Sequence, residues 1–334
     1  MNLDLRKSVE LYCDNYLELK KPLAWKANSM YIKLCAFSYT SEKAHANPDK
    51  LLEASRYIKE STGFFSYLRS ARIYSAAFLT AQGEPVEKSF PRLMNCYDAL
   101  KEAGFRSSTY LPVAAYALYA TTPPGDEMKR ATRAKEIYNG MKQLHPLLTS
   151  YEDYASAIIT ASLDRSISGI FDETEKTFSL LKDQGMGYFN GNGIQYLTHF
   201  LAFEDASPEV KALRCGDIVA LLKQNRQKVT SMYYGAVGFL ALTGKSWEEA
   251  VHDTVEAMAI MKDRGCTRLG EREYSLLLAS ALVCLNRSLN DESRGSLLKT
   301  TVGTTVQAVL AAQAAACAAS GAAAASAASA SSSN

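Results

Sequence analysis

Residues 97–120 read YDALKEAGFRSSTYLPVAAYALYA, and this stretch has the features of a helical hairpin. Its first half ends in an apolar residue, a lysine and, three residues later, Gly104, the pattern of a helix closed by a left-handed glycine. Its second half, from Tyr110 to Ala120, is apolar and rich in alanine, which lets a neighbouring helix approach closely. The stretch therefore predicts two packed helices joined by a short turn.

The same pattern recurs along the chain about every 40 residues. In each copy a bulky apolar residue precedes a lysine near the end of an amphipathic helix, and glycine follows again at Gly185 and Gly265. In six of the seven copies, the residue four positions before this lysine is also apolar. It shares a helix face with the apolar residue that directly precedes the lysine. The marker lysines are Lys20, Lys59, Lys101, Lys142, Lys182, Lys223 and Lys262.

A hairpin of this kind can bury its apolar face only against the next hairpin. We therefore predict an all-α fold, an α-α superhelix (solenoid) of about seven tetratricopeptide-like helical hairpins. We find no sustained alternation with period two, so no strands are expected. The expected domains are a helical-hairpin repeat domain over residues 1–295, a C-terminal capping helix over 296–312 and an Ala/Ser-rich low-complexity tail over 313–334.

Several hairpins begin with residues that favour the start of a helix. Asn47 and Ser207 each precede a proline, and proline suits the first position of a helix. Two further pairs fit a capping box or a looser acidic form of it: Ser246 with Glu249, and Asp172 with Glu175.

The composition is that of a soluble globular chain: 334 residues, 47% hydrophobic and 22% charged. A net charge of +2 gives no reason to expect nucleic acid as a partner. Seven dispersed cysteines without a C-x-x-C pair predict reduced thiols, and the N-terminus lacks a signal sequence, so we expect a cytoplasmic protein. Residues 302–334 carry no charge, yet alanine is only weakly apolar; we expect no membrane partner, with a tail anchor as the alternative.

Two Glu-x-x-His pairs would resemble half of a di-iron site if they lay on facing helices: Glu42 with His45, and Glu249 with His252. They fall in the first and seventh hairpins, which an extended stack places about 50 Å apart. We therefore expect no metal site and no cofactor. His145 and His199 are expected to be structural, because neither has a companion at ligand spacing.

Two other segments could contact a ligand. The glycine-rich segment 185–193 does not match the dinucleotide-binding fingerprint, so we expect a long turn, with a ligand-contacting loop as the alternative. The segment from Met128 to Glu136 carries four basic residues, with Lys129 and Arg133 on one face. We expect a solvated helix face there, with a phosphate-binding patch as the alternative.

Nineteen tyrosines are more than usual, and many recur near the start of the second helix of a hairpin. One tyrosine per hairpin would form a ladder suited to binding, because the ring offers a large apolar face with a polar tip. The alternative is that each ring fills the space between hairpins. The candidate binding residues are Tyr110, Tyr154, Tyr196, Tyr234 and Tyr274.

The repeated helix pairs, the tyrosine-rich second helices, turns such as Leu181-Lys182-Asp183-Gln184-Gly185 and the uncharged C-terminal segment resemble domain-of-unknown-function family 4003 of the Firmicutes. The resemblance covers nearly the whole chain. It implies a cytosolic bacterial protein without an assigned activity, so it transfers no functional residue to this sequence.

Our leading hypothesis is a non-enzymatic scaffold whose concave groove binds a protein or peptide, since solenoids present extended concave surfaces. The first alternative is a peptide-sensing regulator of tetratricopeptide-like type. The second is an all-helical enzyme with an internal active site, which would need polar groups converging from several second helices. No catalytic residue is predicted.

Overall fold

The computed structural model describes residues 1–186, 191–267 and 270–290, and every regular element within them is helical. The capping helix and tail expected over residues 296–312 and 313–334 lie outside this part of the chain. The α helices are α1 (Leu3–Leu23), α2 (Ser29–Ser41), α3 (Pro48–Glu60), α4 (Tyr67–Ser70), α5 (Arg72–Ala81), α6 (Val86–Glu102), α7 (Leu111–Thr121), α8 (Glu127–Leu144), α9 (Tyr154–Thr160), α10 (Ile167–Asp183), α11 (Gly191–Leu201), α12 (Pro208–Gln224), α13 (Tyr234–Ala241), α14 (Trp247–Asp263) and α15 (Arg272–Asn290). Three short 3-10 helices are η1 (Tyr151–Asp153), η2 (Ser231–Tyr233) and η3 (Gly244–Ser246).

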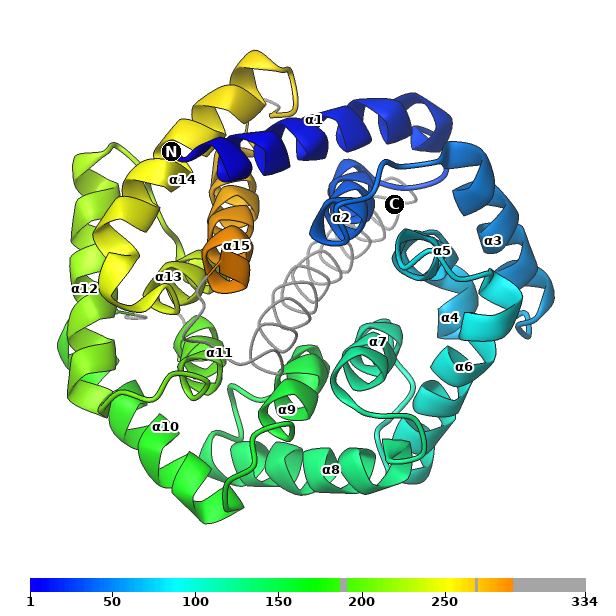
Figure 1. Ribbon diagram of the computed structural model, residues 1–334. Coiled ribbons are helices and arrows are strands. Elements are labelled where there is room, and N and C mark those ends of the chain that lie inside the picture. The colour runs from blue at the N-terminus through cyan, green and yellow to red at the C-terminus, as the bar shows by residue number, and fades with distance from the viewer. Residues whose placement is uncertain (187–190, 268–269, 291–334) are drawn as a thin grey trace, which may run out of the picture.

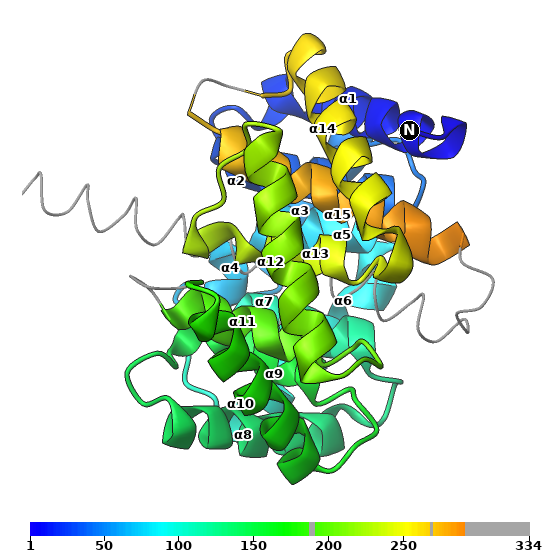
Figure 2. The same ribbon diagram turned by 90° about the vertical axis from the view of Figure 1, so that its left-hand side faces the viewer.

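The helices alternate between the outer and inner layers of a ring (Figure 1). Each outer helix packs on the inner helix that completes its hairpin, and the single turn α4 precedes the inner helix α5. Figure 2 shows the turns from outer to inner helices on one face of the ring, at the left, and those from inner to outer helices on the opposite face. The inner helices therefore run in the same direction through the ring. The outer helices are α1, α3, α6, α8, α10, α12 and α14, and the inner ones are α2, α5, α7, α9, α11, α13 and α15.

The ring is closed, because α1 packs against both α14 and α15, and α2 also contacts α15. We call this junction the seam. In the described residues, the first and last helix pairs are therefore neighbours. The premise that they lie about 50 Å apart is wrong, because that distance assumed an extended stack with two separate ends.

The outer helices end as the glycine pattern predicts. Gly104, Gly185 and Gly265 all have positive φ angles, of +92°, +78° and +72°. At Gly104 the amide donates to the carbonyl of Lys101, and the next amide donates to the carbonyl of Leu100, which satisfies two of the last helix acceptors. In α12 the same left-handed position is taken by a residue other than glycine, Arg226, with a φ of +58°.

Three of the predicted helix starts are confirmed, at Asn47, Ser207 and Ser246, although the expected capping bond is absent at Ser246, and the start at Asp172 is wrong. The side chain of Asn47 accepts from the Lys50 amide at 3.0 Å, and that of Ser207 accepts from the Val210 amide at 3.4 Å. Ser246 makes no capping bond, because its hydroxyl donates to the carbonyl of Thr243 instead.

The acidic pair at Asp172 is not a helix start. Helix α10 begins five residues earlier, at Ile167, where the Ser166 side chain accepts from the Gly169 amide at 3.1 Å. Asp172 therefore lies inside the helix. A serine at the capping position readily accepts a hydrogen bond from a backbone amide, and Ser166 determines where α10 begins.

The apolar stripe of the outer helices forms the core. The residues that precede the marker lysines are at most 1% exposed: Leu19, Ile58, Leu100, Met141, Leu181, Leu222 and Met261. Some marker lysines also cover an aromatic ring one turn earlier. The Lys20 ammonium lies 5.7 Å from the Tyr16 ring centre, and that of Lys101 lies 5.9 Å from the ring of Tyr97.

Arginines on the outer helices bind the free carbonyl groups at the ends of the inner helices. The Arg92 guanidinium donates to the Tyr119 carbonyl at 3.1 Å, and Arg214 donates to the Ala241 carbonyl at 3.0 Å. Arg133 donates to the carbonyls of Ala161, Leu163 and Arg165 at 3.2, 3.1 and 2.5 Å. Each of these arginines lies nine residues before its marker lysine, so the sequence carried an unused periodic signal.

The basic segment from Met128 to Glu136 is therefore not simply a solvated face. Arg130 and Arg133 are half-buried, and both donate to the Ala161 carbonyl. A solvated face was expected from the charge pattern alone. That pattern cannot show that the end of α9, with its unsatisfied carbonyls, lies beside these side chains.

We expect Arg133→Met to lower the free energy of unfolding by about 1.5 to 3 kcal/mol, because three carbonyls in the turn after α9 lose a charged donor. Urea unfolding followed by far-UV circular dichroism measures the change. Lys129→Met is the matched control, since Lys129 is exposed one turn earlier and should change stability by less than about 0.5 kcal/mol. Equal losses in both variants would contradict the capping role.

Candidate functional site

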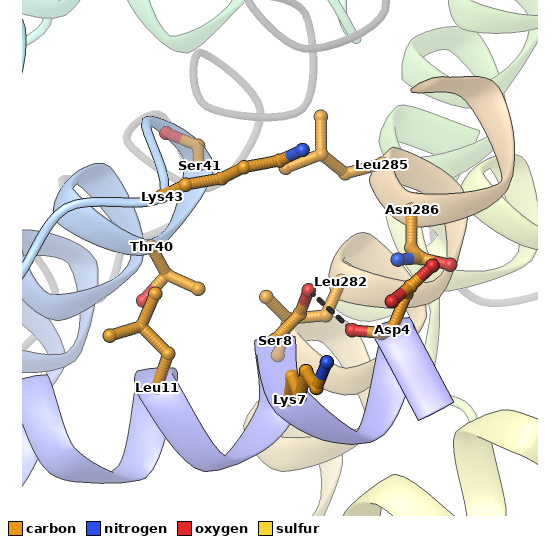
Figure 3. Close-up of a pocket in the computed structure, with 10 residues that line it drawn as sticks. All are labelled: Asp4, Lys7, Ser8, Leu11, Thr40, Ser41, Lys43, Leu282, Leu285 and Asn286. Carbon is orange, nitrogen blue, oxygen red and sulfur yellow. Dashed lines mark hydrogen bonds between the residues drawn. The ribbon is translucent and has the colours of Figure 1, made fainter. Parts of the chain in front are cut away.

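A cavity of about 230 Å³ lies at the seam, where the first turns of α1 meet the end of α2 and the last turns of α15 (Figure 3). Helix α1 contributes Asp4, Lys7, Ser8 and Leu11, which are spaced at helical intervals and therefore share one face. The hydroxyl of Ser8 donates to the Asp4 carbonyl at 3.0 Å. The buried stripe of α1 occupies a different face, so the same helix both packs the core and lines the cavity.

The end of α2 positions a second lysine at the cavity. Lys43 adopts a left-handed conformation with a φ of +54°, its amide donates to the Thr40 carbonyl at 3.0 Å, and the next amide donates to the Tyr39 carbonyl at 2.9 Å. This conformation costs a residue with a Cβ roughly 1 to 2 kcal/mol. Figure 3 shows the Lys43 side chain extending along one side of the cavity towards Leu285, with Lys7 on the opposite side.

The cavity combines an apolar wall with cations and hydroxyl groups. Its polar lining includes one carboxylate, from Asp4, which Figure 3 shows beside Asn286 of α15. Such a lining suits an aliphatic group that carries a negative charge. The leucines can cover the aliphatic part, and the ammonium groups can pair with the negative charge. The apolar wall is formed by Leu11, Leu282 and Leu285, and the hydroxyls come from Ser8, Thr40 and Ser41.

A buried ion pair joins the two sides of the seam. Lys33 of α2 is fully buried, and its ammonium lies 2.5 Å from a carboxylate oxygen of Glu271, just before α15. The hydroxyl of Ser29 donates to the other oxygen of Glu271 at 3.0 Å. A buried charge is tolerated only when it is paired and hydrogen-bonded, so this pair requires the seam to be closed.

Aromatic rings surround the Lys33 ammonium. It lies 5.6 Å from the ring centre of Tyr16 and 5.9 Å from that of Tyr274, and such contacts stabilise a desolvated cation. The Tyr274 hydroxyl donates to the Met30 carbonyl at 3.3 Å, which adds a contact between α15 and α2.

Further contacts cross the outer part of the seam. Arg264 pairs with Asp14 at 2.6 Å, and Arg6 of α1 pairs with Glu256 of α14 at 3.2 Å. Both pairs are largely exposed, so each contributes at most about 1 kcal/mol. The seam is therefore stabilised mainly by its buried part.

Two thiols also meet at the seam. Cys13 of α1 and Cys266, which follows α14, are fully buried, and the Cys266 sulfur lies 4.0 Å from the Cys13 carbonyl oxygen. The hydrogen bond between the thiols, together with burial, holds the pKa of Cys13 well above its usual value. All cysteines of the described residues are free and buried, as expected from their spacing in the sequence.

The five tyrosines predicted as a binding ladder all belong to inner helices or their first turns. Tyr154 and Tyr274 are 1% exposed, so a ligand could reach their rings only after a rearrangement, whereas Tyr110, Tyr196 and Tyr234 are half-buried. The Tyr154 hydroxyl accepts from the Arg106 amide at 3.1 Å. The Tyr154 ring meets those of Phe105, Tyr138 and Tyr151, none of which belongs to the predicted ladder. The binding role of the five tyrosines stays a prediction.

The residues of the two Glu-x-x-His pairs have different surroundings. Glu249 pairs with Arg287 at 3.3 Å, and His45 is exposed in the turn after α2. In the part of the chain that the structure describes, no group of three His, Cys, Asp or Glu side chains is placed to hold a metal ion.

The other two histidines differ in their surroundings. His145 has a partner that the sequence did not reveal, the Glu175 carboxylate at 2.9 Å. His199 is buried, and burial lowers its pKa to about 4, so its ring is neutral at pH 7. A void of about 10 Å³ beside it, lined also by Tyr196 and Thr160, has room for no more than one water molecule.

The glycine-rich segment 185–193 lies partly outside the described residues. Its described end differs from the long turn that we expected, because α11 begins at Gly191 and Gly193 is helical. A Cβ atom at Gly193 would lie 2.1 Å from the Ser231 carbonyl oxygen. Glycine at this position therefore permits the close approach of α11 to η2.

Sequence reasoning missed Lys7, Lys33 and Lys43. Lys33 carried a usable signal, since it is the one charged residue in the apolar stretch 30–39, and a buried lysine requires a partner. Lys7 and Lys43 carried none, because exposed lysines are common and nothing local indicates that α1 and α2 meet α15.

A family model described as "Protein of unknown function (DUF4003)" matches residues 15–315. The chain belongs to this family. This confirms the resemblance found in the sequence. The chain is also 22% identical to a Bacillus subtilis (strain 168) protein, the uncharacterized protein YeaA, over 315 residues that cover 92% of this chain and 93% of the relative. No solved structure matched the chain.

None of the described helices in this DUF4003 protein combines the length and hydropathy needed to cross a membrane. The segment proposed as an alternative tail anchor, residues 302–334, lies outside the described residues.

Proposed function

We propose that this DUF4003 protein is a non-enzymatic peptide-binding protein, a superhelix of about seven tetratricopeptide-like hairpins whose first and last members meet. Its ligand is the C-terminal end of a peptide with an aliphatic last side chain, held in the seam cavity. The observation that carries the proposal is the cavity lining, which offers leucines on one wall and the ammonium groups of Lys7 and Lys43 on opposite sides. The ligand proposed here binds at the seam, whereas the sequence suggested the concave groove.

The size of the cavity supports a chain end. Pockets for drug-sized ligands measure about 300 to 1,000 Å³, so about 230 Å³ suits one or two terminal residues. The carboxylate would lie between Lys7 and Lys43. The Ser8 hydroxyl already donates to the Asp4 carbonyl, so its oxygen would accept from the last peptide amide. Because both lysines are exposed, each contributes little, and we expect dissociation constants of roughly micromolar magnitude.

The position of the cavity favours a second candidate, the peptide-sensing regulator. A ligand at the seam contacts α1, α2 and α15, so it binds the closed ring better than a ring in which these helices have separated. At 100 times its dissociation constant, such a ligand would stabilise the closed form by about 2.7 kcal/mol. Sensing would then consist of a shift in the closure of the seam.

Binding of fluorescently labelled peptides tests the proposal. We expect a peptide ending in leucine with a free carboxylate to bind at least about tenfold more tightly than its C-terminal amide, because the amide cannot pair with the ammonium groups. Lys7→Ala combined with Lys43→Gly should abolish this preference. Lys43→Gly should not reduce stability, because glycine adopts the left-handed conformation without strain.

The matched control combines Lys88→Ala with Lys129→Ala, which removes two exposed lysines from other outer helices and should leave binding unchanged. N-acetyl-leucine distinguishes a peptide C-terminus from a small aliphatic carboxylate as the ligand. If N-acetyl-leucine binds as tightly as the peptide, the ligand is the small carboxylate. Equal binding of the acid and the amide, or the absence of binding, would refute the proposal.

A further inference from the structure

Two neighbouring turns carry exposed aromatic side chains. Both turns lie on the face of the ring that carries the outer-to-inner turns, at the left in Figure 2. Trp25, between α1 and α2, is 100% exposed, and Phe64 and Phe65, between α3 and α4, are 79% and 92% exposed. Helix α1 packs against α3, and α2 against α5, so these turns belong to adjacent hairpins. Aromatic rings of this size are usually buried, and clusters of them in solvent mark interaction sites.

The second turn is held in shape while its rings point away from the core. The rings of Phe64 and Phe65 meet edge to face, with centres 5.1 Å apart. The Arg69 guanidinium lies 5.8 Å from the Phe64 ring and donates to the carbonyls of Thr62 and Lys59 at 3.0 and 2.5 Å. The exposure of the rings is therefore a property of an ordered turn.

Positive charge is concentrated around the same two turns. Residues 18–28 contain three lysines and one glutamate, and residues 56–72 contain four basic residues and one glutamate. The whole chain has a net charge of only +2, so the rest of the sequence is on balance acidic. Lys21, Lys26 and Lys59 are exposed, and they lie four, one and five residues along the chain from the nearest of these aromatic residues.

We propose that this aromatic and basic edge, formed by Trp25, Phe64, Phe65, Lys21, Lys26 and Lys59, docks on an anionic lipid surface. Aromatic rings favour the boundary between headgroups and acyl chains, and lysines near it are attracted to acidic headgroups. The three rings are 79 to 100% exposed and project from two turns, a shape that suits shallow insertion into a bilayer better than enclosure of a peptide. The binding is peripheral and does not depend on the seam cavity.

Sedimentation with sucrose-loaded vesicles tests this proposal. We expect vesicles of phosphatidylcholine with 30% phosphatidylglycerol to bind the full-length chain at least about tenfold more strongly than vesicles of phosphatidylcholine alone. The chain has two tryptophans, Trp25 and Trp247, so Trp247→Phe leaves Trp25 as the sole reporter. Its fluorescence should then shift to shorter wavelength when anionic vesicles are added.

A triple variant, Trp25→Ser with Phe64→Ser and Phe65→Ser, should bind at least about tenfold more weakly and keep its circular dichroism spectrum, because the three rings are exposed. Leu147→Ser is the matched control, since Leu147 is 98% exposed on another outer-to-inner turn, and it should bind like the parent. Equal binding to neutral and anionic vesicles, an unshifted Trp25 spectrum or unchanged binding of the triple variant would each overturn the proposal.

Discussion

Replacing Lys33 with methionine should lower the free energy of unfolding by about 3 to 5 kcal/mol, the cost of leaving one member of a buried ion pair without the other. The Lys33 ammonium is fully buried and lies 2.5 Å from the carboxylate of Glu271, whose side chain is 19% exposed. Methionine fills a similar volume but leaves that carboxylate without its cation. Urea unfolding followed by circular dichroism measures the loss.

Lys211→Met is the matched control for this prediction. Lys211 is 1% exposed and pairs with Glu173, away from the seam, so its replacement should also destabilise the protein. Only Lys33→Met should speed hydrogen exchange in α1 and α15 and enlarge the radius of gyration in mild urea. Combining Lys33→Met with Glu271→Gln should restore part of the stability, because no unpaired charge remains. A loss below about 1 kcal/mol in Lys33→Met would contradict the importance of the pair.

Gly193→Ala should destabilise the protein by about 3 kcal/mol, although alanine normally favours a helix over glycine by about 1 kcal/mol. The reversed sign follows from the packing. The added Cβ would lie 2.1 Å from the Ser231 carbonyl oxygen and 2.8 Å from its carbonyl carbon, so α11 and η2 would have to separate. Thermal unfolding of the variant beside the parent chain measures the effect.

Gly63→Ala provides the control for Gly193→Ala. A Cβ atom at Gly63 would meet nothing within 4 Å, and its substitution should change stability by less than about 0.5 kcal/mol. If Gly193→Ala stabilised the protein as helix propensity predicts, the close approach of α11 to η2 would be refuted.

The local parts of the fold could be predicted because they depend on neighbouring residues. The burial of Leu100 and Leu181 follows from helical periodicity, and the ends of their helices follow from Gly104 and Gly185. The caps at Asn47 and Ser207 follow from proline and a side-chain acceptor. At Ser246 the pattern located the start of α14 correctly but predicted a capping bond that is absent, because the hydroxyl donates to the Thr243 carbonyl instead.

The candidate site was much less predictable than the helices. Lys33 could have been suspected from its apolar surroundings, but its partner, Glu271, lies 238 residues away. Arg92, Arg133 and Arg214 repeat at a fixed offset, yet their role became apparent only from the carbonyl groups beside them. The tyrosine ladder was chosen for its periodicity, which cannot show which ring faces the interior of a hairpin pair.

The sequence by itself determined that this chain forms helical hairpins, where the outer helices end and which of their faces is buried. These properties depend on contacts within a few residues, which repeat with the helical period and leave a readable pattern. Only the tertiary structure decided that the first and last hairpins meet, and with them the seam cavity beside Lys7 and Lys43. That closure depends on the summed rotation between successive hairpins and on long-range pairs such as Lys33 with Glu271. Neither of these leaves a periodic pattern in the sequence.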